Sequence, residues 1–171
     1  MILFDTDLGS DSAPGRRSAR DAAIPRNDRI PSARTLARFL REACEAVRLR
    51  GHVTVLLTSD MAIRRLNRQF RGKNKPTDVL SFPAISVGDE EITGDLAISV
   101  ETARKQAREQ GHALSVEIKI LMLHGLLHLA GYDHETDSGQ MARRERLLRG
   151  RLGLPKGLIE RVENEPVGAP S

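Results

Sequence analysis

The chain has 171 residues, and its 27 lysines and arginines exceed its 23 aspartates and glutamates by a net charge of +4. A length of this order suits a single domain with a sizeable core. One cysteine excludes a disulfide scaffold, and five aromatic residues are too few for RNA-binding modules that stack several bases on aromatic platforms. The longest apolar run, residues 120–130, is too short for a membrane span. Acidic residues soon follow the apolar start, unlike a secretory signal, so we expect a cytoplasmic protein without a membrane partner.

The first 31 residues are expected to form an N-terminal arm. Residues 1–5 are predicted to form an edge strand, and residues 9–29 are rich in serine, glycine, alanine and charged side chains, as in a flexible loop. Residues 32–163 then form the domain itself. Residues 164–171 contain glycine and proline and are expected to be a frayed tail.

The domain begins with alternating helices and strands. Helical periodicity starts after Pro31 and is expected to end at Gly51, a typical C-terminal cap. The β-branched run 53–58 predicts a strand. Ser59 or Asp60 is expected to cap the short helix that follows. That helix carries its apolar side chains on one side: Ile63, Leu66 and Phe70.

A basic loop over residues 71–76 leads into the second half of the domain. The remaining predicted elements are two strands, 78–82 and 94–99, and three helices, 101–110, 115–130 and 141–152. Strands and helices do not alternate strictly, so we predict an α+β fold: one domain with a small mixed β-sheet packed against helices. The helix 115–130 is apolar around most of its circumference, and we expect it to be the buried centre.

Three of the five histidines fall at the C-terminal end of that central helix. His124 and His128 are four residues apart, which places both imidazoles on one helix face where they can share a metal. Gly131 is expected to end the helix, so that a turn brings His134 back as a third ligand. Three protein ligands with one open position are typical of catalytic zinc. The other two histidines, His52 and His112, follow glycines and are expected to be solvated.

Two buried core histidines and a surface histidine are the alternative interpretation of this cluster. Gly125 favours the metal site, because a mid-helix glycine usually marks close packing or a close approach. Three imidazoles suit zinc, but they also suit nickel, copper or iron, so the sequence leaves the metal open.

The histidine spacing is also that of extended zinc-protease motifs. Those proteases place a glutamate, their general base, directly after the first histidine. Gly125 stands at that position here. A metallopeptidase therefore stays an alternative that lacks its base.

Charge is segregated along the chain. Residues 34–75 carry 11 basic and 3 acidic side chains, whereas residues 76–134 carry 4 basic and 9 acidic ones. A basic segment of this kind suits a polyanion, although solvated helix faces would account for most of its arginines. The exceptions are Arg71, Lys73 and Lys75, which crowd one loop. An arginine there can contact a phosphate held at a metal, because its planar donors match phosphate oxygens.

Four segments of the chain form long, specific motifs. The segment 124–134 reads HGLLHLAGYDH, the segments 66–73 and 76–83 read LNRQFRGK and PTDVLSFP, and the segment 94–99 reads GDLAIS. These motifs resemble those of the YbeY endoribonucleases, the rRNA maturation factors. The resemblance extends from about residue 36 to residue 154, and Phe70 stands where the family often has tyrosine.

The resemblance implies a zinc-dependent endoribonuclease that is specific for single-stranded RNA and binds one zinc per chain. It implies a role in late 3′-end maturation of small-subunit rRNA and in ribosome quality control, with ribosomal particles as partners. His124, His128 and His134 carry over as metal ligands, and Arg71 carries over as the functional arginine. Arg71 and His124 are thus the expected catalytic residues, and Lys73 and Lys75 are candidates for RNA binding.

Three aspartates are candidates for orienting the histidines. Asp133 is expected to act in this way, whereas Asp78 and Asp95 more readily cap turns. The general base and the oligomeric state are open at this point. The alternatives are the metallopeptidase and a non-catalytic ribosome-assembly factor that uses its metal only for folding.

Overall fold

The computed structural model describes residues 1–8, 24–73, 77–84 and 92–155. Lys75, the tail 164–171 and most of the predicted N-terminal loop lie outside the described residues. Short 3-10 turns cover Thr6–Leu8 and Arg26–Asp28. Among the described helices, none is long and apolar enough to cross a membrane.

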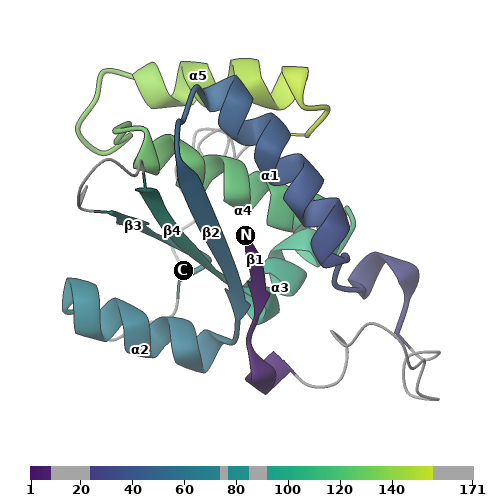
Figure 1. Cartoon of the computed structure of the whole chain (residues 1–171). Helices are drawn as coiled ribbons and strands as arrows, with labels where there is room; N and C mark the ends of the chain where they lie inside the picture. The colour runs from purple at the N-terminus through teal and green to yellow at the C-terminus, as the bar shows by residue number, and fades with distance from the viewer. Residues whose placement is uncertain (9–23, 74–76, 85–91, 156–171) are drawn as a thin grey trace, which may run out of the picture.

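The strands form one mixed four-stranded sheet in the order β1-β2-β4-β3 (Figure 1). Strands β1 (Ile2–Phe4), β2 (His52–Thr58) and β4 (Ile92–Ser99) are parallel, whereas β3 (Val79–Pro83) runs antiparallel to β4. The predicted small mixed sheet is therefore confirmed. Strand β3 covers residues 79–83 where the sequence predicted 78–82, and it can include Pro83 because an edge strand tolerates a residue without a backbone N–H.

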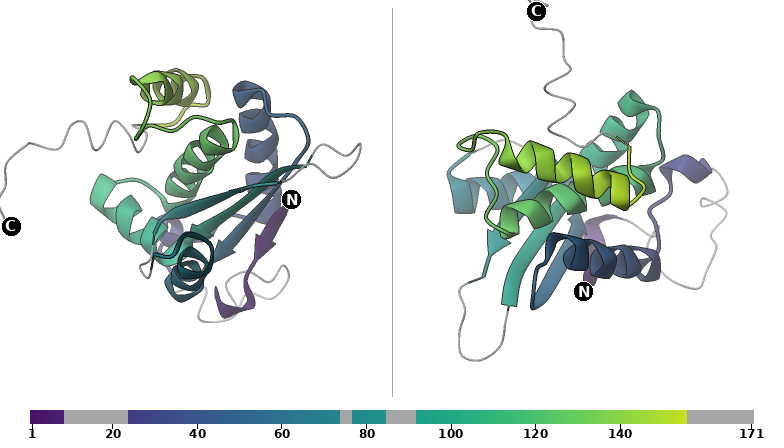
Figure 2. Two further views of the ribbon diagram at one scale, coloured as in Figure 1. Left: turned by 90° about the vertical axis from the view of Figure 1, so that its left-hand side faces the viewer. Right: turned by 90° about the horizontal axis from the view of Figure 1, so that it is seen from above.

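Helices cover both faces of the sheet, as Figure 2 shows. Helix α2 (Asp60–Arg71) packs on one face, and α1 (Ala33–Val47) and α4 (Leu114–Leu129) pack on the other. Helix α3 (Val100–Gln110) follows β4 directly, and α5 (Gln140–Arg151) lies over α4 on the side away from the sheet. This arrangement confirms the α+β class.

Helix α4 is the buried centre of the domain, as predicted. Its side chains contact the sheet, α1, α3 and α5, so nearly every residue from Ile118 to Leu127 is withdrawn from water. A smaller apolar cluster of Ile63, Leu80 and Ala97 lies between α2 and the sheet. The larger core therefore lies on the α4 face, where burial of apolar surface fixes the position of this helix.

Two helix ends differ from the sequence prediction. Helix α1 ends at Val47, and Arg48 rather than Gly51 is its left-handed C-cap, with φ of 64°. Helix α2 begins after a Ser59 cap, whose side chain accepts from the N–H of Ala62, and it continues through Arg71 to Gly72. Arg71 is thus the last helical residue instead of the first loop residue. A helix end holds an arginine in a more defined position than a loop does.

Candidate metal centre

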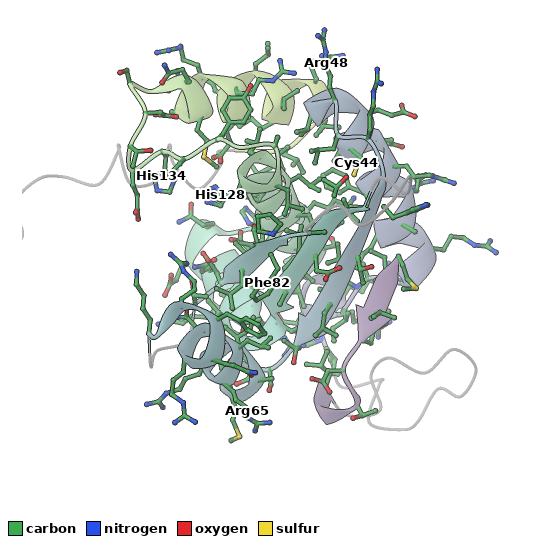
Figure 3. All side chains as sticks on the ribbon, turned by 60° about the vertical axis from the view of Figure 1, so that its left-hand side comes forward. Cys44, Arg48, Arg65, Phe82, His128 and His134 are labelled. Carbon is green, nitrogen blue, oxygen red and sulfur yellow. The ribbon has the colours of Figure 1, made fainter. Side chains whose placement is uncertain are left out.

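The C-terminal end of α4 brings two imidazoles together. His124 and His128 project from successive turns, and their Nε2 atoms are 3.2 Å apart. The helix ends at Leu129, and Gly131 adopts a positive φ of 94° in the turn that returns the chain toward the helix end. His134 follows this turn, and one nitrogen from each of the three rings lies within 4.8 Å of the others. His128 and His134 are seen at this end of α4 in Figure 3.

The cluster extends from the core to solvent. His124 is buried, His128 is half-buried and His134 is exposed. Burial lowers the pKa of the His128 imidazole, and the neighbouring His124 and His134 lower it further. A lowered pKa keeps the ring neutral, which is the form that binds metals.

A buried carboxylate orients the innermost ring. The Nδ1 atom of His124 lies 2.9 Å from Oε2 of Glu145, a residue of α5, and both side chains are almost completely buried. Because a carboxylate only accepts, Nδ1–H must donate to it, and Nε2 is left to face the other two rings. This is the usual carboxylate–histidine support of a metal ligand.

Sequence reasoning missed Glu145. Its signal was present in the pattern of the last helix, where Met141, Glu145 and Leu148 share the core-facing stripe. A carboxylate at an apolar position of an amphipathic helix requires a polar partner in the core.

The donor chemistry of the cluster fits a transition-metal ion. Three imidazole nitrogens suit zinc and related metals, and the structure supplies three convergent donors with a fixed tautomer at the innermost one. His134 lies on the exposed side, so one coordination position can face solvent. His124, His128 and His134 could therefore hold a metal ion, and the site has the three-ligand form typical of catalytic zinc.

The cluster opens into a cleft of about 430 Å³. The three histidines line it together with side chains from the end of α2, the edge strand β3 and the turn after α4: Arg71, Thr77, Asp78, Val79, Ser81, Pro83, Asp133 and Glu135. Arg71 reaches the cleft from α2, on the opposite face of the sheet from α4. The cleft thus combines three imidazoles with an arginine and with several carboxylates.

The predicted aspartates have different surroundings. Asp133 lines the cleft, but its carboxylate accepts from Glu135 N–H and from the hydroxyl of Thr136 within its own turn. Asp78 also lines the cleft, and it accepts from the N–H of Val79 and from the side chain of Gln106. These contacts match the structural role expected of Asp78.

Two further sequence candidates lie outside the lining of the cleft. Asp95 is exposed on β4, and Lys73 is exposed two residues beyond Arg71.

Gly125 permits the close approach of α4 to the sheet. A Cβ atom at this position would lie 2.8 Å from Cδ2 of Leu96, and the Ser81 hydroxyl donates to the carbonyl oxygen of Gly125 at 3.1 Å. The glycine therefore marks close packing, as the sequence indicated. A protease-type glutamate at this position would force the buried Leu96 side chain to shift.

The two remaining histidines differ from each other. His52 is exposed at the start of β2, as expected. His112 is half-buried against the carboxylate of Glu117, so the expectation of a solvated side chain was wrong for it. Glu117 is buried in the first turn of α4 and requires a polar neighbour, which the sequence pattern did not reveal.

A family model and similar curated proteins identify one family. A family model described as Endoribonuclease YbeY matches residues 23–153. An Endoribonuclease YbeY from Koribacter versatilis is 53% identical over 131 residues, which cover 77% of this chain and 84% of the relative. Another from Solibacter usitatus is 48% identical over 153 residues, which cover 90% and 99%. The solution structure of TM1509 from Thermotoga maritima is 30% identical and covers 82% of this chain and 96% of that one, with a TM-score of 0.49.

Proposed function

The chain belongs to the YbeY endoribonuclease family, and we propose that it cleaves single-stranded RNA in the cleft beside His124, His128 and His134. Family membership supports the endoribonuclease role. The observation that carries the choice of site is the convergence of three imidazoles within 4.8 Å in a cleft that Arg71 also lines. A phosphodiester could contact both groups at once there.

In this proposal the three histidines hold one zinc ion per chain. When bound, such a metal supplies Lewis acidity to the scissile phosphate or to an attacking water. His124 keeps its Nε2 directed at the site because its Nδ1–H is held by Glu145. His128 stays neutral because burial and its two imidazole neighbours lower its pKa. These two effects prepare the donors before any ion arrives.

Arg71 has the task of binding the phosphate. Its guanidinium can donate two parallel hydrogen bonds to phosphate oxygens and can stabilise the negative charge that develops as the phosphodiester bond breaks. The helix ends at Arg71, and the next residue, Gly72, is its C-cap with φ of 66°. The arginine therefore extends from a rigid element into the cleft, which lowers the cost of positioning it. Arg71 and His124 are the residues that we propose as catalytic.

The proposed substrate is ribosomal RNA, in late 3′-end maturation of the small-subunit rRNA and in ribosome quality control. The support for this finer assignment is the resemblance of segments 66–73, 76–83 and 124–134 to the rRNA maturation factors. Lys73, exposed beside Arg71, would add positive charge for the RNA backbone, and Asp133 would add negative charge near His128. A cytoplasmic location follows from this substrate.

The test compares substrates on one preparation of the zinc-loaded protein. We expect cleavage of single-stranded RNA, little cleavage of the same sequence as a duplex, and no cleavage of an unstructured polypeptide. Cleavage of the polypeptide but not of RNA would overturn the proposal in favour of a metallopeptidase. Binding of ribosomal particles without any RNA cleavage would favour an assembly factor.

A further inference from the structure

Phe70 is an exposed aromatic residue beside the cleft. It occupies the last turn of α2, on the same side of the helix as Ile63 and Leu66. Ile63 is fully buried, whereas 60% of Phe70 is exposed to solvent. A single exposed apolar side chain is common on protein surfaces, so any role of Phe70 depends on how its ring is held and on what surrounds it.

A second ring holds Phe70 in place. The ring of Phe82 on β3 meets Phe70 edge to face, with centroids 5.2 Å apart and planes at 68°. Phe82 in turn packs against the small cluster of Ile63, Leu80 and Ala97, so its position is fixed by the core. Edge-to-face pairs of this kind are attractive beyond their buried area. Phe70 is therefore a positioned ring with a solvent-accessible surface.

The aromatic pair adjoins the cleft at the edge of the sheet. Arg71, Ser81 and Pro83 line the cleft. Phe70 directly precedes Arg71 in the chain, and Phe82 stands between Ser81 and Pro83. Among the described strands, β3 is the last of the sheet on this side, next to β4. In Figure 3 Phe82 lies on the α2 side of β3, while His128 and His134 lie beyond the other side. A strand of RNA that leaves the cleft at Arg71 would pass this edge.

The surroundings of Phe70 are strongly basic. The exposed positively charged side chains of α2 and the residues after it are Arg64, Arg65, Arg68, Arg71 and Lys73. The acidic residue of this helix is Asp60, in its first turn, and its carboxylate accepts hydrogen bonds from the hydroxyl groups of Ser99 and Thr102. This charge favours a polyanion over an apolar protein surface as the partner of Phe70.

We propose that Phe70 is a stacking platform for one unpaired base of the RNA whose phosphate occupies the cleft. The inference rests on the proposed endoribonuclease function and adds to it a reason for single-strand specificity. A base in a duplex is already stacked and paired, whereas an unpaired base can lie on the ring. The scarcity of aromatic residues excludes a platform for several bases, but a single ring suffices for one base.

The first experiment uses the absence of tryptophan from this chain. The variant Phe70→Trp carries a single indole, and Met61→Trp is its control, because Met61 is 72% exposed in the first turn of the same helix. Both are combined with His128→Ala to prevent cleavage. Single-stranded RNA should quench the Phe70→Trp fluorescence, whereas an abasic strand of equal length should not. The Met61→Trp fluorescence should stay unchanged. Equal quenching by the abasic strand would overturn the proposal.

The second experiment separates binding from chemistry. Removal of one base–aromatic stack should raise the KM of Phe70→Ala for single-stranded RNA by about 5- to 100-fold, with kcat within about twofold of the unaltered protein. The variant Phe70→Tyr, which keeps an aromatic ring, should have the KM of the unaltered protein, and so should Met61→Ala. An unchanged KM in Phe70→Ala would overturn the platform while the endoribonuclease function stood. If the unaltered protein cleaves no RNA, the proposed function fails instead, and the fluorescence titration alone decides whether Phe70 contacts a base.

Discussion

The two ends of α4 carry similar pairs of side chains with different surroundings. At the N-terminal end, His112 lies against the buried carboxylate of Glu117, and at the C-terminal end His124 lies against the buried carboxylate of Glu145. In both pairs an imidazole gives a hydrogen-bonding partner to a carboxylate that is buried in the core. Two further imidazoles, from His128 and His134, join the second pair alone. Within the described ranges, this cluster is the one group of three potential metal donors.

The comparison shows that a buried histidine–glutamate pair is not by itself a functional site. The first pair lies where α3 turns into α4 and supports the helix start. The second pair faces a cleft lined by the edge strand β3 and by Arg71. A metal centre results when the oriented imidazole also meets convergent donors and an opening to solvent.

The largest expected effect is that of His128→Ala. Loss of one of three ligands should weaken metal binding by more than about 100-fold, which exceeds the loss typical when a residue that hydrogen-bonds to a ligand is mutated. The variant should also lose RNA cleavage. Metal titration of the purified variant measures the first effect, and an RNA-cleavage assay measures the second. Because His128 is only half-buried, the circular dichroism spectrum should match that of the unaltered protein. Full metal occupancy in this variant would show that the metal binds at a site other than the three histidines.

Arg71→Ala should separate metal binding from catalysis. The metal content should stay at one per chain, and kcat for RNA should fall by about 10²- to 10³-fold, as when one transition-state donor is removed. Arg65→Ala is the matched control, because Arg65 is exposed on the same helix but outside the cleft lining (Figure 3). Equal losses of kcat in the two variants would mean that Arg71 contributes only its positive charge and makes no specific contact with the phosphate.

Glu145→Gln should show whether the second pair tunes the metal. The amide keeps the shape and a hydrogen bond to Nδ1–H of His124 but loses the charge, so metal affinity should fall by about 10- to 100-fold. The same substitution at the other end of the helix, Glu117→Gln, should leave metal affinity unchanged. Competition with a chelator of known affinity measures both. A loss in Glu117→Gln as large as in Glu145→Gln would erase the distinction between the two pairs.

The smallest functional effect belongs to His112→Ala. This variant removes one partner of the buried Glu117 carboxylate, so the free energy of unfolding should fall by about 1–3 kcal/mol. Metal content and cleavage rate at a permissive temperature should not change. Denaturant unfolding measures the first quantity. A change in metal content without a loss of stability would show that the N-terminal pair also serves the site.

Local sequence patterns predicted most of the fold and the three histidines. The apolar circumference of α4, the spacing of His124 and His128, and the stop at Gly131 are short-range features that one stretch of chain displays. Contacts between distant segments were not predictable in this way. Glu145 joins the site from α5 across 21 residues, and His112 is held by a glutamate that looks like an ordinary helix-start acid.

The misplaced residues on α2 have a similar cause. Periodicity placed Phe70 on the apolar side of the helix with Ile63, but Ile63 is buried, whereas Phe70 contacts the ring of Phe82 on the edge strand β3 and stays 60% exposed. Arg71, expected as the first loop residue, is the last residue of the helix. Periodicity shows which side of a helix is apolar, but not how much of that side its neighbours cover.

The most direct measurement follows RNA cleavage as the metal is removed from the unaltered protein. A chelator is added in steps, and bound zinc per chain and cleavage rate are determined on the same samples. We predict a rate proportional to bound zinc, which reaches the uncatalysed level when the three histidines are empty and returns when zinc is restored. A cleavage rate that persists in metal-free, folded protein would contradict a catalytic metal centre at His124, His128 and His134.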